Sequence, residues 1–509
     1  MNTLNFAMFL EAAVRSVPDA PFVHSGSISR TYAETDLLAR RYANLLSHHG
    51  VKRGDMVMML LPNSFEFISA QFGILKCGAV PVPLNPQTPA PELLRYLNDS
   101  GSVALFALPS SFESAAVAYS EAPACKHLII LDTEDKEREH AESFHPDLPD
   151  ISNEFESVDT RPEEPALILY TAGTTGQPKG VVLTHFNMYY QATVVQRDFW
   201  EVDSTDVVLM IAPGTHIFGQ TLMYVAMSAH ARLVLMERFV PNIFLETVQN
   251  TGVTFFAGVP ALAHFLLNSP VVEQYDLKSL SHVMLGGAPV PPEIISRLSE
   301  KFGITVITGY GFTEGVPPCY LNERMMKDAP IGTVGLPAFG TDVRIVDEED
   351  VELPRGEIGE IVVRGPMMFR EYHGLPETTD EALRNGWFHS GDLGKQDEHG
   401  YVYIVDRLKD MIKTSGYAVY PAEVERVLIN HPAVIEAAVI GVPHDAVGEI
   451  VKGLVTIRPD QEVSPRELIS YCKTQLAPYK CPRRIEIRDA LPKSPSGKIL
   501  RRLLKGDAA

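Results

Sequence analysis

Short apolar runs alternate with longer amphipathic stretches through the first 330 residues of the chain. The runs 56–61, 128–131 and 232–236 are almost entirely apolar, which is typical of strands buried on both faces. Between them, stretches such as 32–49 and 66–76 place apolar residues at helical spacing. Because strands that alternate with helices form βαβ units, we expect an α/β fold with two mainly parallel sheets in a large N-terminal domain.

The pattern changes after residue 332. Short β-rich segments such as 342–346 and 357–363 are separated by Pro and Gly, which predicts a small β-barrel subdomain over about 332–405. A helix at 421–430, strands at 435–440 and 452–457, a helix at 464–476 and a strand at 484–487 follow. We therefore predict an N-terminal domain over 1–408 and a small α+β C-terminal domain over 409–509.

Composition and charge narrow the class of protein. The chain has 509 residues, of which 45% are hydrophobic and 21% charged, so it is globular and large enough for about three compact units. A net charge of −20 argues against nucleic acid or anionic lipid as a partner. The segment 135–149 reads as a charged surface loop. One basic stretch, 493–505, remains either a solvated helix face or a site for a phosphorylated small molecule.

Five irregularly spaced cysteines indicate neither a disulfide framework nor a zinc site, and favour a reducing compartment. The first fifteen residues lack a basic leader and argue against a signal peptide. The most apolar region, 207–236, is interrupted by Pro, Gly, His and Gln, so no integral membrane segment is expected. We expect a cytoplasmic protein, and a homodimer is left open.

The segment 170–180 reads YTAGTTGQPKG and directly follows the apolar run 165–169. Its glycines permit backbone conformations closed to other residues and let N–H groups approach a ligand closely. Its threonines and its lysine add donors and one positive charge, which suits phosphate oxygens. The spacing differs from GxxxxGK[ST] and so excludes the common P-loop. These residues alone leave an ordinary surface loop open.

This segment resembles the phosphate-binding motif of the adenylate-forming (AMP-binding) acyl-CoA synthetase superfamily, closest in motifs to medium- and long-chain fatty acyl-CoA and aryl-CoA ligases. Five further stretches agree in order and spacing, so the match covers essentially the whole chain: GGAP at 286–289, GYGFTE at 309–314, WFHSGD at 387–392, VDRLKDMIKTSG at 405–416 and PKSPSGKILRR at 492–502. The resemblance implies an AMP-forming ligase that activates an apolar carboxylic acid with ATP and passes the acyl group to CoA.

The chemistry explains why such motifs are needed. A carboxylic acid is a poor acyl donor, and joining it to the α-phosphate of ATP with loss of pyrophosphate supplies a better leaving group. Attack of one anion on another requires cationic compensation. By resemblance, Glu314 binds Mg²⁺, Thr313 contacts the α-phosphate, and the loop 171–179 holds the β- and γ-phosphates. Without its YGFT context, Glu314 would read as a solvated loop carboxylate.

The resemblance also places the nucleoside. Tyr310 stacks on adenine, and Asp392 accepts hydrogen bonds from the ribose hydroxyls with the assistance of Arg407. An Asp that caps a β-turn is the structural alternative for Asp392. The predicted nucleotide and CoA contacts are Thr171, Ala172, Gly173, Thr174, Thr175, Gly176, Lys179, Gly287, Ala288, Pro289, Tyr310, Gly311, Thr313, Asp392, Arg407, Lys413 and Gly416.

The family carries out two half-reactions by rotating its C-terminal domain. By resemblance Lys498 is the catalytic lysine of adenylation, and Lys409 is the hinge about which this mobile domain turns. Lys413 and Gly416 then approach for the thioester step. A lysine on a loop such as 494–498 is otherwise a surface residue. The neighbouring Arg501, Arg502 and Lys505 are expected to form a solvated basic face.

The acyl site is the part that the sequence specifies least. His216 aligns with the family's aromatic or histidine gate, although a lone histidine in an apolar run is more often a core residue. The candidate pocket stretches contain no Lys or Arg, which favours an apolar acid, fatty or aryl, over a dicarboxylate. The pocket candidates are His216, Phe218, Gly258, Val259, Gly286, Phe312, Gly315 and Val316, and the catalytic candidates are Lys498, His216, Thr313 and Glu314.

Two positions depart from the family pattern, and two other functions stay open. Ala172 stands where the motif usually has serine, and Ala418 stands where several aryl ligases carry a polar amide. Ala418 therefore weakens a close analogy to hydroxycinnamate ligases.

The adenylate could instead pass to an amine or to a carrier-protein thiol. A catalytically dead ligand-binding or scaffold protein is disfavoured, because Glu314, Asp392, Arg407 and Lys498 are all present.

Overall fold

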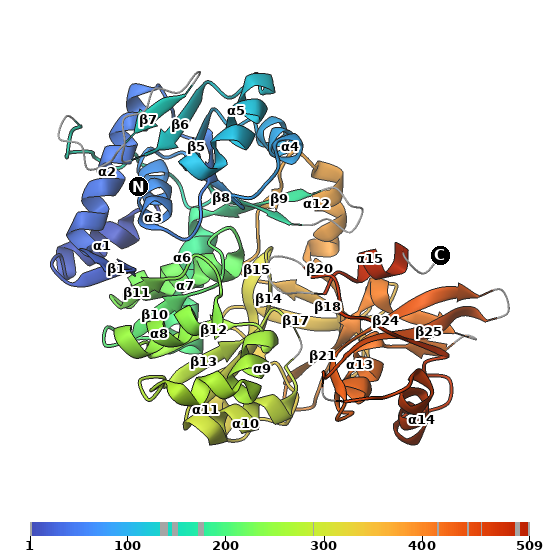
Figure 1. Cartoon of the computed structure of the whole chain (residues 1–509). Coiled ribbons are helices and arrows are strands. Elements are labelled where there is room, and N and C mark those ends of the chain that lie inside the picture. Colours follow the sequence, from blue (N-terminus) through green and yellow to red (C-terminus); the bar gives the residue numbers. More distant parts are fainter. Residues whose placement is uncertain are drawn as a thin grey trace.

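Two sheets of mainly parallel strands, joined by helices, make up most of the first 330 residues, as the alternating pattern predicts (Figure 1). The structure is a computed structural model. It describes residues 3–132, 141–144, 151–171, 178–288, 290–414, 417–444, 447–459, 461–493 and 499–506. The α/β fold class is confirmed.

The N-terminal sheet is parallel throughout, and the central sheet is parallel except at its edges. The N-terminal sheet has the order β4 (Val80–Leu84), β3 (Met56–Leu60), β5 (Ala104–Ala107), β6 (His127–Leu131), β7 (Glu142–Phe144). The central sheet has the order β16 (Leu336–Pro337), β15 (Gly315–Leu321), β14 (Thr305–Phe312), β13 (His282–Leu285), β12 (Phe255–Gly258), β10 (Val207–Met210), β11 (Arg232–Leu235), β1 (Pro21–Ser25), β2 (Ile28–Thr31). In the central sheet, β2, β15 and β16 run antiparallel to their neighbours.

The remaining strands pair mostly antiparallel. One sheet joins β19 (Glu371–Tyr372), β9 (Lys179–Thr184) and β8 (Pro165–Thr171). The β-rich subdomain is a sheet in the order β17 (Asp342–Val346), β18 (Gly359–Arg364), β20 (Phe388–Gln396), β21 (Val402–Arg407), which is open rather than closed into a barrel. The C-terminal sheet has the order β23 (Tyr417–Val419), β22 (Ile412–Thr414), β25 (Gly448–Ile457), β24 (Val434–His444), and β26 (Arg484–Ile487) pairs with β25.

Helices cover these sheets and end where the sequence provides caps. Thr31 and Glu34 form a capping box at the start of α2, and Gly101 and Gly252 adopt the left-handed conformation after α4 and α8. The helices are α1 (Met8–Ser16), α2 (Tyr32–His48), α3 (Phe65–Lys76), α4 (Ala90–Ser100), α5 (Phe112–Glu121), α6 (His185–Val194), α7 (Ile217–Ser228), α8 (Pro241–Thr251), α9 (Pro260–Asn268), α10 (Pro292–Phe302), α11 (Glu323–Met326), α12 (Pro376–Ala382), α13 (Pro421–Ile429), α14 (Pro465–Gln475) and α15 (Arg501–Gly506).

The buried apolar residues form separate clusters in the N-terminal and the C-terminal parts of the chain. A large apolar cluster lies among α1, α2, α3, α7 and the two parallel sheets, while a separate cluster that includes Val424, Val455 and Leu468 belongs to the C-terminal residues. A domain boundary at Lys409 stays a prediction.

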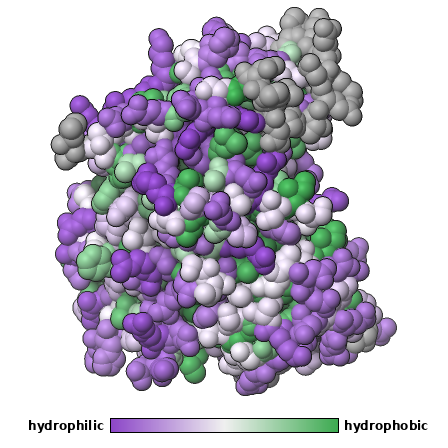
Figure 2. Space-filling view, turned by 90° about the vertical axis from the view of Figure 1, so that its left-hand side faces the viewer, coloured by the Kyte–Doolittle hydropathy of each residue, from purple (hydrophilic) through white to green (hydrophobic). Residues whose placement is uncertain are grey.

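The face drawn in Figure 2 is mostly hydrophilic, with apolar side chains scattered among polar ones. Among the described residues, no helix combines the length and the apolar composition needed to cross a membrane.

One segment differs from its predicted structure. The stretch 135–149 was expected to be a loop, but its described part contains β7, which pairs in parallel with β6 at the sheet edge. Backbone pairing with an existing strand edge decides the structure here, and the charged composition of the segment gives no sign of it.

A buried histidine makes the stability of this interior depend on pH. His185 is fully buried, and its Nδ1 accepts a hydrogen bond from the Phe6 backbone N–H at 3.1 Å. Desolvation lowers the pKa of His185 to about 4. In the unfolded chain this imidazole has its ordinary pKa near 6.5, so its contribution to the stability of the folded state is fully present above that pH. This contribution is lost as the pH falls towards 4.

We expect His185 alone to remove roughly 3 kcal/mol of stability between pH 7 and pH 4. The His185→Asn variant keeps an acceptor for Phe6 but cannot gain this proton. Urea unfolding at both pH values measures the effect. The variant should lose less stability than the wild type on acidification, and an equal loss in both proteins would contradict the assignment.

Candidate active site

Residues assigned to the acyl site lie at the carboxyl ends of adjacent parallel strands. In the register of the central sheet, Gly258 at the end of β12 pairs with Leu285 at the end of β13, and Leu285 pairs with Thr308 of β14. The N–H of Gly286 donates to the carbonyl of Gly258 at 3.0 Å. Gly287 and Ala288 follow as an exposed turn. Ligands of open α/β sheets bind beyond this edge, so the fold brings these residues to the expected place.

Aromatic and aliphatic side chains surround this edge. Phe218, in the first turn of α7, lies with its ring centroid 6.3 Å from that of the buried Trp200. A Cβ added to Gly286 would lie 4.0 Å from the Phe218 ring. Val259 precedes α9, and Val316 of β15 packs beside Gly311 of β14 in the neighbouring hairpin. The predicted apolar acyl residues are therefore assembled around one sheet edge.

The loop that carries His216 is fixed by an asparagine from the loop that follows strand β3 of the other parallel sheet. Asn63 donates through Nδ2 to the carbonyls of Met210, Ala212 and Met236, and its Oδ1 accepts from the Gly214 N–H at 2.8 Å. His216 then precedes α7 and is partly buried. Asn63 was not predicted as a site residue, because its role depends on pairing across 150 residues of chain.

Thr313 and Glu314 form the two-residue turn between β14 and β15, since Phe312 pairs with Gly315. The Glu314 carbonyl accepts from the Phe369 N–H at 2.7 Å. This hairpin therefore presents both side chains at the end of the central sheet.

A tyrosine that the sequence analysis missed connects Glu314 to the phosphate-binding segment. The Tyr372 hydroxyl donates to Glu314 Oε1 at 2.7 Å, and the Lys179 ammonium lies 4.7 Å from the centroid of the Tyr372 ring. Burial, followed by the charge of Glu314, raises the pKa of Tyr372, so its hydroxyl stays a neutral donor. Thr171 faces Lys179 across the β8–β9 pair. One tyrosine thus holds the cation over its ring and the carboxylate at its hydroxyl.

The predicted nucleoside residues meet between the central sheet and the β-rich sheet. The Tyr310 hydroxyl donates to Asp392 Oδ2 at 2.6 Å, and Arg407 Nε lies 3.1 Å from Asp392 Oδ1. Asp392 and Arg407 are direct partners on β20 and β21. Burial raises the pKa of Tyr310, which keeps its hydroxyl protonated. A buried carboxylate with one cationic partner can accept further hydroxyl protons, which suits a ribose diol.

The predicted hinge and thiol-step residues lie further along the chain. Lys409 sits in the short turn Leu408–Asp410, and desolvation together with the nearby charge of Arg407 lowers its pKa. Lys413 is exposed on β22, and its backbone N–H donates to Glu449 Oε2 at 2.9 Å.

The expected solvated basic face is wrong for Arg501. Its guanidinium is about three-quarters buried. Its Nη2 donates to the two carboxylate oxygens of Glu425 at 2.7 and 2.9 Å, and its Nε donates to Oε1 at 3.2 Å. It also donates to Asp410 at 3.1 Å, and Lys505 lies 3.6 Å from the same residue. Helix α13 and the segment 406–410 converge on α15, and no sequence spacing signals this approach.

Eight predicted residues lie outside the described residues, and their predictions stay untested: Ala172, Gly173, Thr174, Thr175, Gly176, Pro289, Gly416 and Lys498.

Glu314 is the carboxylate predicted to bind a divalent cation. The described residues contain no cluster of three or more His, Cys, Asp or Glu side chains suited to a metal. Mg²⁺ is commonly held by one or two carboxylates together with substrate phosphates and water. Glu314 fits this mode, because only its Oε1 is engaged by Tyr372.

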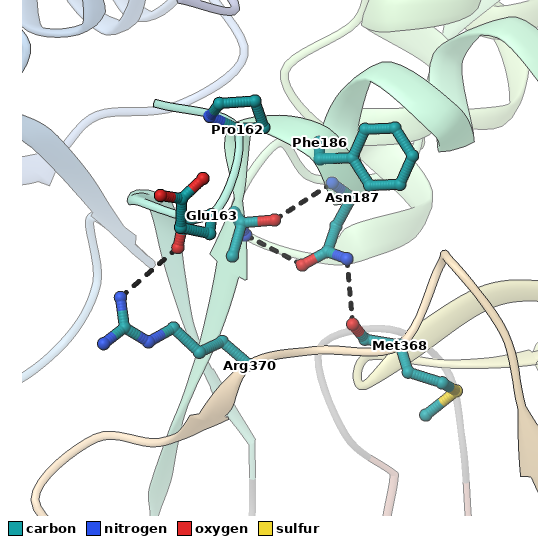
Figure 3. A pocket seen from close by; sticks show the side chains of 7 residues that line it. Pro162, Glu163, Phe186, Asn187, Met368 and Arg370 are labelled. Carbon is teal, nitrogen blue, oxygen red and sulfur yellow. Dashed lines mark hydrogen bonds between the residues drawn. The ribbon is translucent and has the colours of Figure 1, made fainter. Parts of the chain in front are cut away.

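A pocket of about 420 Å³ lies apart from these residues (Figure 3). Asn187 caps α6 with Thr184 and donates to the carbonyls of Pro366 and Met368. The Met368 side chain in turn packs against Gly315. We assign the pocket itself no ligand, and its residues support the chain segment behind the Thr313–Glu314 turn.

Comparison with known proteins identifies the family. The model of the AMP-binding enzyme family matches residues 10–373, and that of the AMP-binding enzyme C-terminal domain matches residues 423–498. The chain is 37% identical over 488 residues to a feruloyl-CoA synthase from Amycolatopsis, which covers 96% of each protein. It is 33% identical to a long-chain-fatty-acid–CoA ligase from Escherichia coli, covering 98% of this chain and 94% of that protein. The crystal structure of an anthranilate CoA ligase with anthranoyl-AMP superimposes with a TM-score of 0.92 at 26% identity, over 100% of this chain and 98% of that one.

The chain therefore belongs to the AMP-binding, adenylate-forming enzyme family. Within it, the chain is an AMP-forming acid–thiol ligase, an acyl-CoA synthetase that uses ATP, a carboxylic acid and CoA. The predicted family and class of reaction are confirmed.

Proposed function

We propose that the chain activates an apolar fatty or aryl acid as its acyl-adenylate and transfers the acyl group to the thiol of CoA. The observation that carries this proposal is the meeting of Asp392, Tyr310 and Arg407 beside the Thr313–Glu314 turn. A polar site for the nucleotide thus borders an apolar edge that lacks a described lysine or arginine. The names of the relatives agree with both classes of acid.

In the first half-reaction, a carboxylate oxygen of the acid attacks the α-phosphorus of ATP. The bond from that phosphorus to the bridging oxygen breaks, and pyrophosphate leaves. Asp392 and Arg407 orient the ribose, Tyr310 lies along adenine, and the loop that includes Thr171 and Lys179 holds the outer phosphates. Lys498 compensates the charge that develops on the α-phosphate and the acid.

Mg²⁺, held by Glu314, supplies positive charge to the phosphate oxygens when bound. Tyr372 fixes the orientation of that carboxylate and keeps Lys179 within reach of the same phosphates. The turn that presents Glu314 also presents Thr313, whose hydroxyl serves the α-phosphate.

In the second half-reaction, the sulfur of CoA attacks the carbonyl carbon of the adenylate. A thioester forms, AMP leaves, and the thiol proton passes to solvent. Lys413 and Gly416 line the approach of the thiol after the C-terminal domain turns about Lys409, while His216 separates the acyl site from that channel. Each of these roles is part of the proposal.

Incubation with ATP, Mg²⁺, CoA and a panel of fatty, aryl and dicarboxylic acids tests the proposal. We expect AMP and a thioester with an apolar acid, and none with a dicarboxylate. An added amine and a carrier-protein thiol compete in the same mixture, and mass spectrometry identifies the product. If AMP forms but the acyl group appears only on the amine or the carrier protein, CoA is the wrong acceptor.

The setting in the cell is also proposed. The five cysteines are all free and buried in the structure, which supports a reducing compartment such as the cytoplasm. Assembly as a homodimer stays a prediction.

A further inference from the structure

The C-terminal residues contact the β-rich sheet through one buried carboxylate. Asp406 lies near the end of β21, three residues before the proposed hinge, and its side chain is 2% exposed. Its Oδ2 accepts from the Ala422 backbone N–H at 2.6 Å, and its Oδ1 lies 3.9 Å from Arg501. Both of these partners follow Lys409 in the chain. Asp406 thus makes a hydrogen bond and a longer ion pair to groups on the far side of the hinge.

Helix α13 has no cap of its own. Tyr420 occupies its N-cap position and makes no side-chain capping bond. The first N–H groups of a helix have no partner within the helix and attract negative charge. Asp406 fills this role from a separate strand, and a rotation about Lys409 would withdraw it.

The contacts of Asp406 also affect helix α15, which follows the proposed catalytic residue Lys498 in the sequence. Arg501, three residues after Lys498, is held by Glu425 of α13, so α15 and α13 are tied together. Burial lowers the pKa of Lys409, and the charges of Lys505 of α15 and Asp392 of the nucleoside site also act on this pKa. Arg407, the residue after Asp406, pairs with Asp392 across β20 and β21, and Asp406 itself pairs with Leu393. The contacts of Asp406 therefore hold helix α15, which begins three residues after Lys498 in the sequence, near the nucleoside residues.

We infer that Asp406 is a positioning residue for adenylation, a latch that caps α13 and holds the C-terminal domain in the orientation that serves the first half-reaction. This inference rests on the proposed function, with its two half-reactions and its hinge. The latch opens before the thioester step, because residues before and after Lys409 must separate when the domain turns. Loss of the latch slows adenylation selectively.

Two assays separate the half-reactions. Exchange of labelled pyrophosphate into ATP, with acid present, reports adenylation, and thioester formation from supplied acyl-AMP and CoA reports the second step. We expect Asp406→Ala to slow exchange at least tenfold and to leave thioester formation within about twofold of the wild type. A purely structural role would lower both rates together.

Two further variants keep the test decisive. Ala422→Pro removes the donor, leaves every charge in place, and puts proline in a first helical turn, where it is tolerated. It should shift the ratio of the two rates in the same direction as Asp406→Ala, even if that variant folds poorly. Asp410→Asn removes another carboxylate partner of Arg501, but one that lies after the hinge, and should leave the ratio unchanged.

Three results would overturn the latch. The first is a parallel fall of both half-reactions in Asp406→Ala and Ala422→Pro, the second is an unaltered exchange rate in both, and the third is an equal shift in Asp410→Asn. A wild-type protein that shows no exchange with any acid would instead refute the proposed function on which the latch rests. The two failures are therefore distinguishable.

Discussion

Replacing Lys498 by alanine is expected to slow pyrophosphate exchange by about 10²–10³-fold, the usual cost of removing one preorganised group that stabilises transition-state charge. Attack of a carboxylate on a phosphate brings two anions together, and this ammonium group is proposed to compensate both. Formation of thioester from supplied acyl-AMP should persist, because the lysine is not needed once the adenylate exists.

Lys493 provides the matched control for this experiment. It lies five residues upstream on the same C-terminal segment and forms an ion pair with Glu436 at 2.5 Å. Lys493→Ala should leave pyrophosphate exchange within about twofold of the wild type, since exposed ion pairs contribute little. Equal losses in the two variants would indicate general damage to the segment, and full exchange in Lys498→Ala would remove the lysine from the mechanism.

Replacing Asp392 by asparagine is expected to raise the KM for ATP by about 10–100-fold. Charged hydrogen bonds contribute roughly 1.5–3 kcal/mol, and each 1.4 kcal/mol corresponds to a factor of ten. The amide turns one acceptor into a donor that faces the ribose hydroxyls, and it leaves Arg407 without its carboxylate. Steady-state kinetics with ATP and with 3′-deoxy-ATP measures the effect.

The deoxynucleotide decides whether Asp392 reads the ribose. The wild type should prefer ATP, and Asp392→Asn should lose most of that preference. Tyr310→Phe removes only the hydroxyl that donates to Asp392 and keeps the ring, so its effect should be smaller. A variant at 392 that still prefers ATP to the same degree would show that another group binds the ribose.

The local pattern of apolar residues and turn residues predicted those strands whose bounds do not depend on distant segments. The strands expected at 342–346 and 484–487 coincide with β17 and β26, because their apolar positions and flanking turns leave little choice. Strand β24 runs four residues beyond its predicted end, since a long hairpin with β25 extends it through the Gly- and Pro-containing residues 441–444. Backbone pairing between distant segments is invisible in composition.

The site residues that belong to recognisable sequence motifs could be predicted. Tyr310, Asp392 and Arg407 come together as the resemblance implies, although they come from separate sheets. Tyr372 was missed because its place depends on the short strand β19 pairing with β9, which lies almost 190 residues earlier. Arg501 was misplaced because its acidic partners converge only in three dimensions.

At Gly286, a substitution is expected to change the acyl site without changing the stability of the fold. A methyl group there would meet the flexible end of Met284, 2.8 Å away, and would lie beside the Phe218 ring. The strands beneath it are already buried and need no adjustment. Selection could therefore retune the range of acids through this one position while the rest of the molecule stays unaltered.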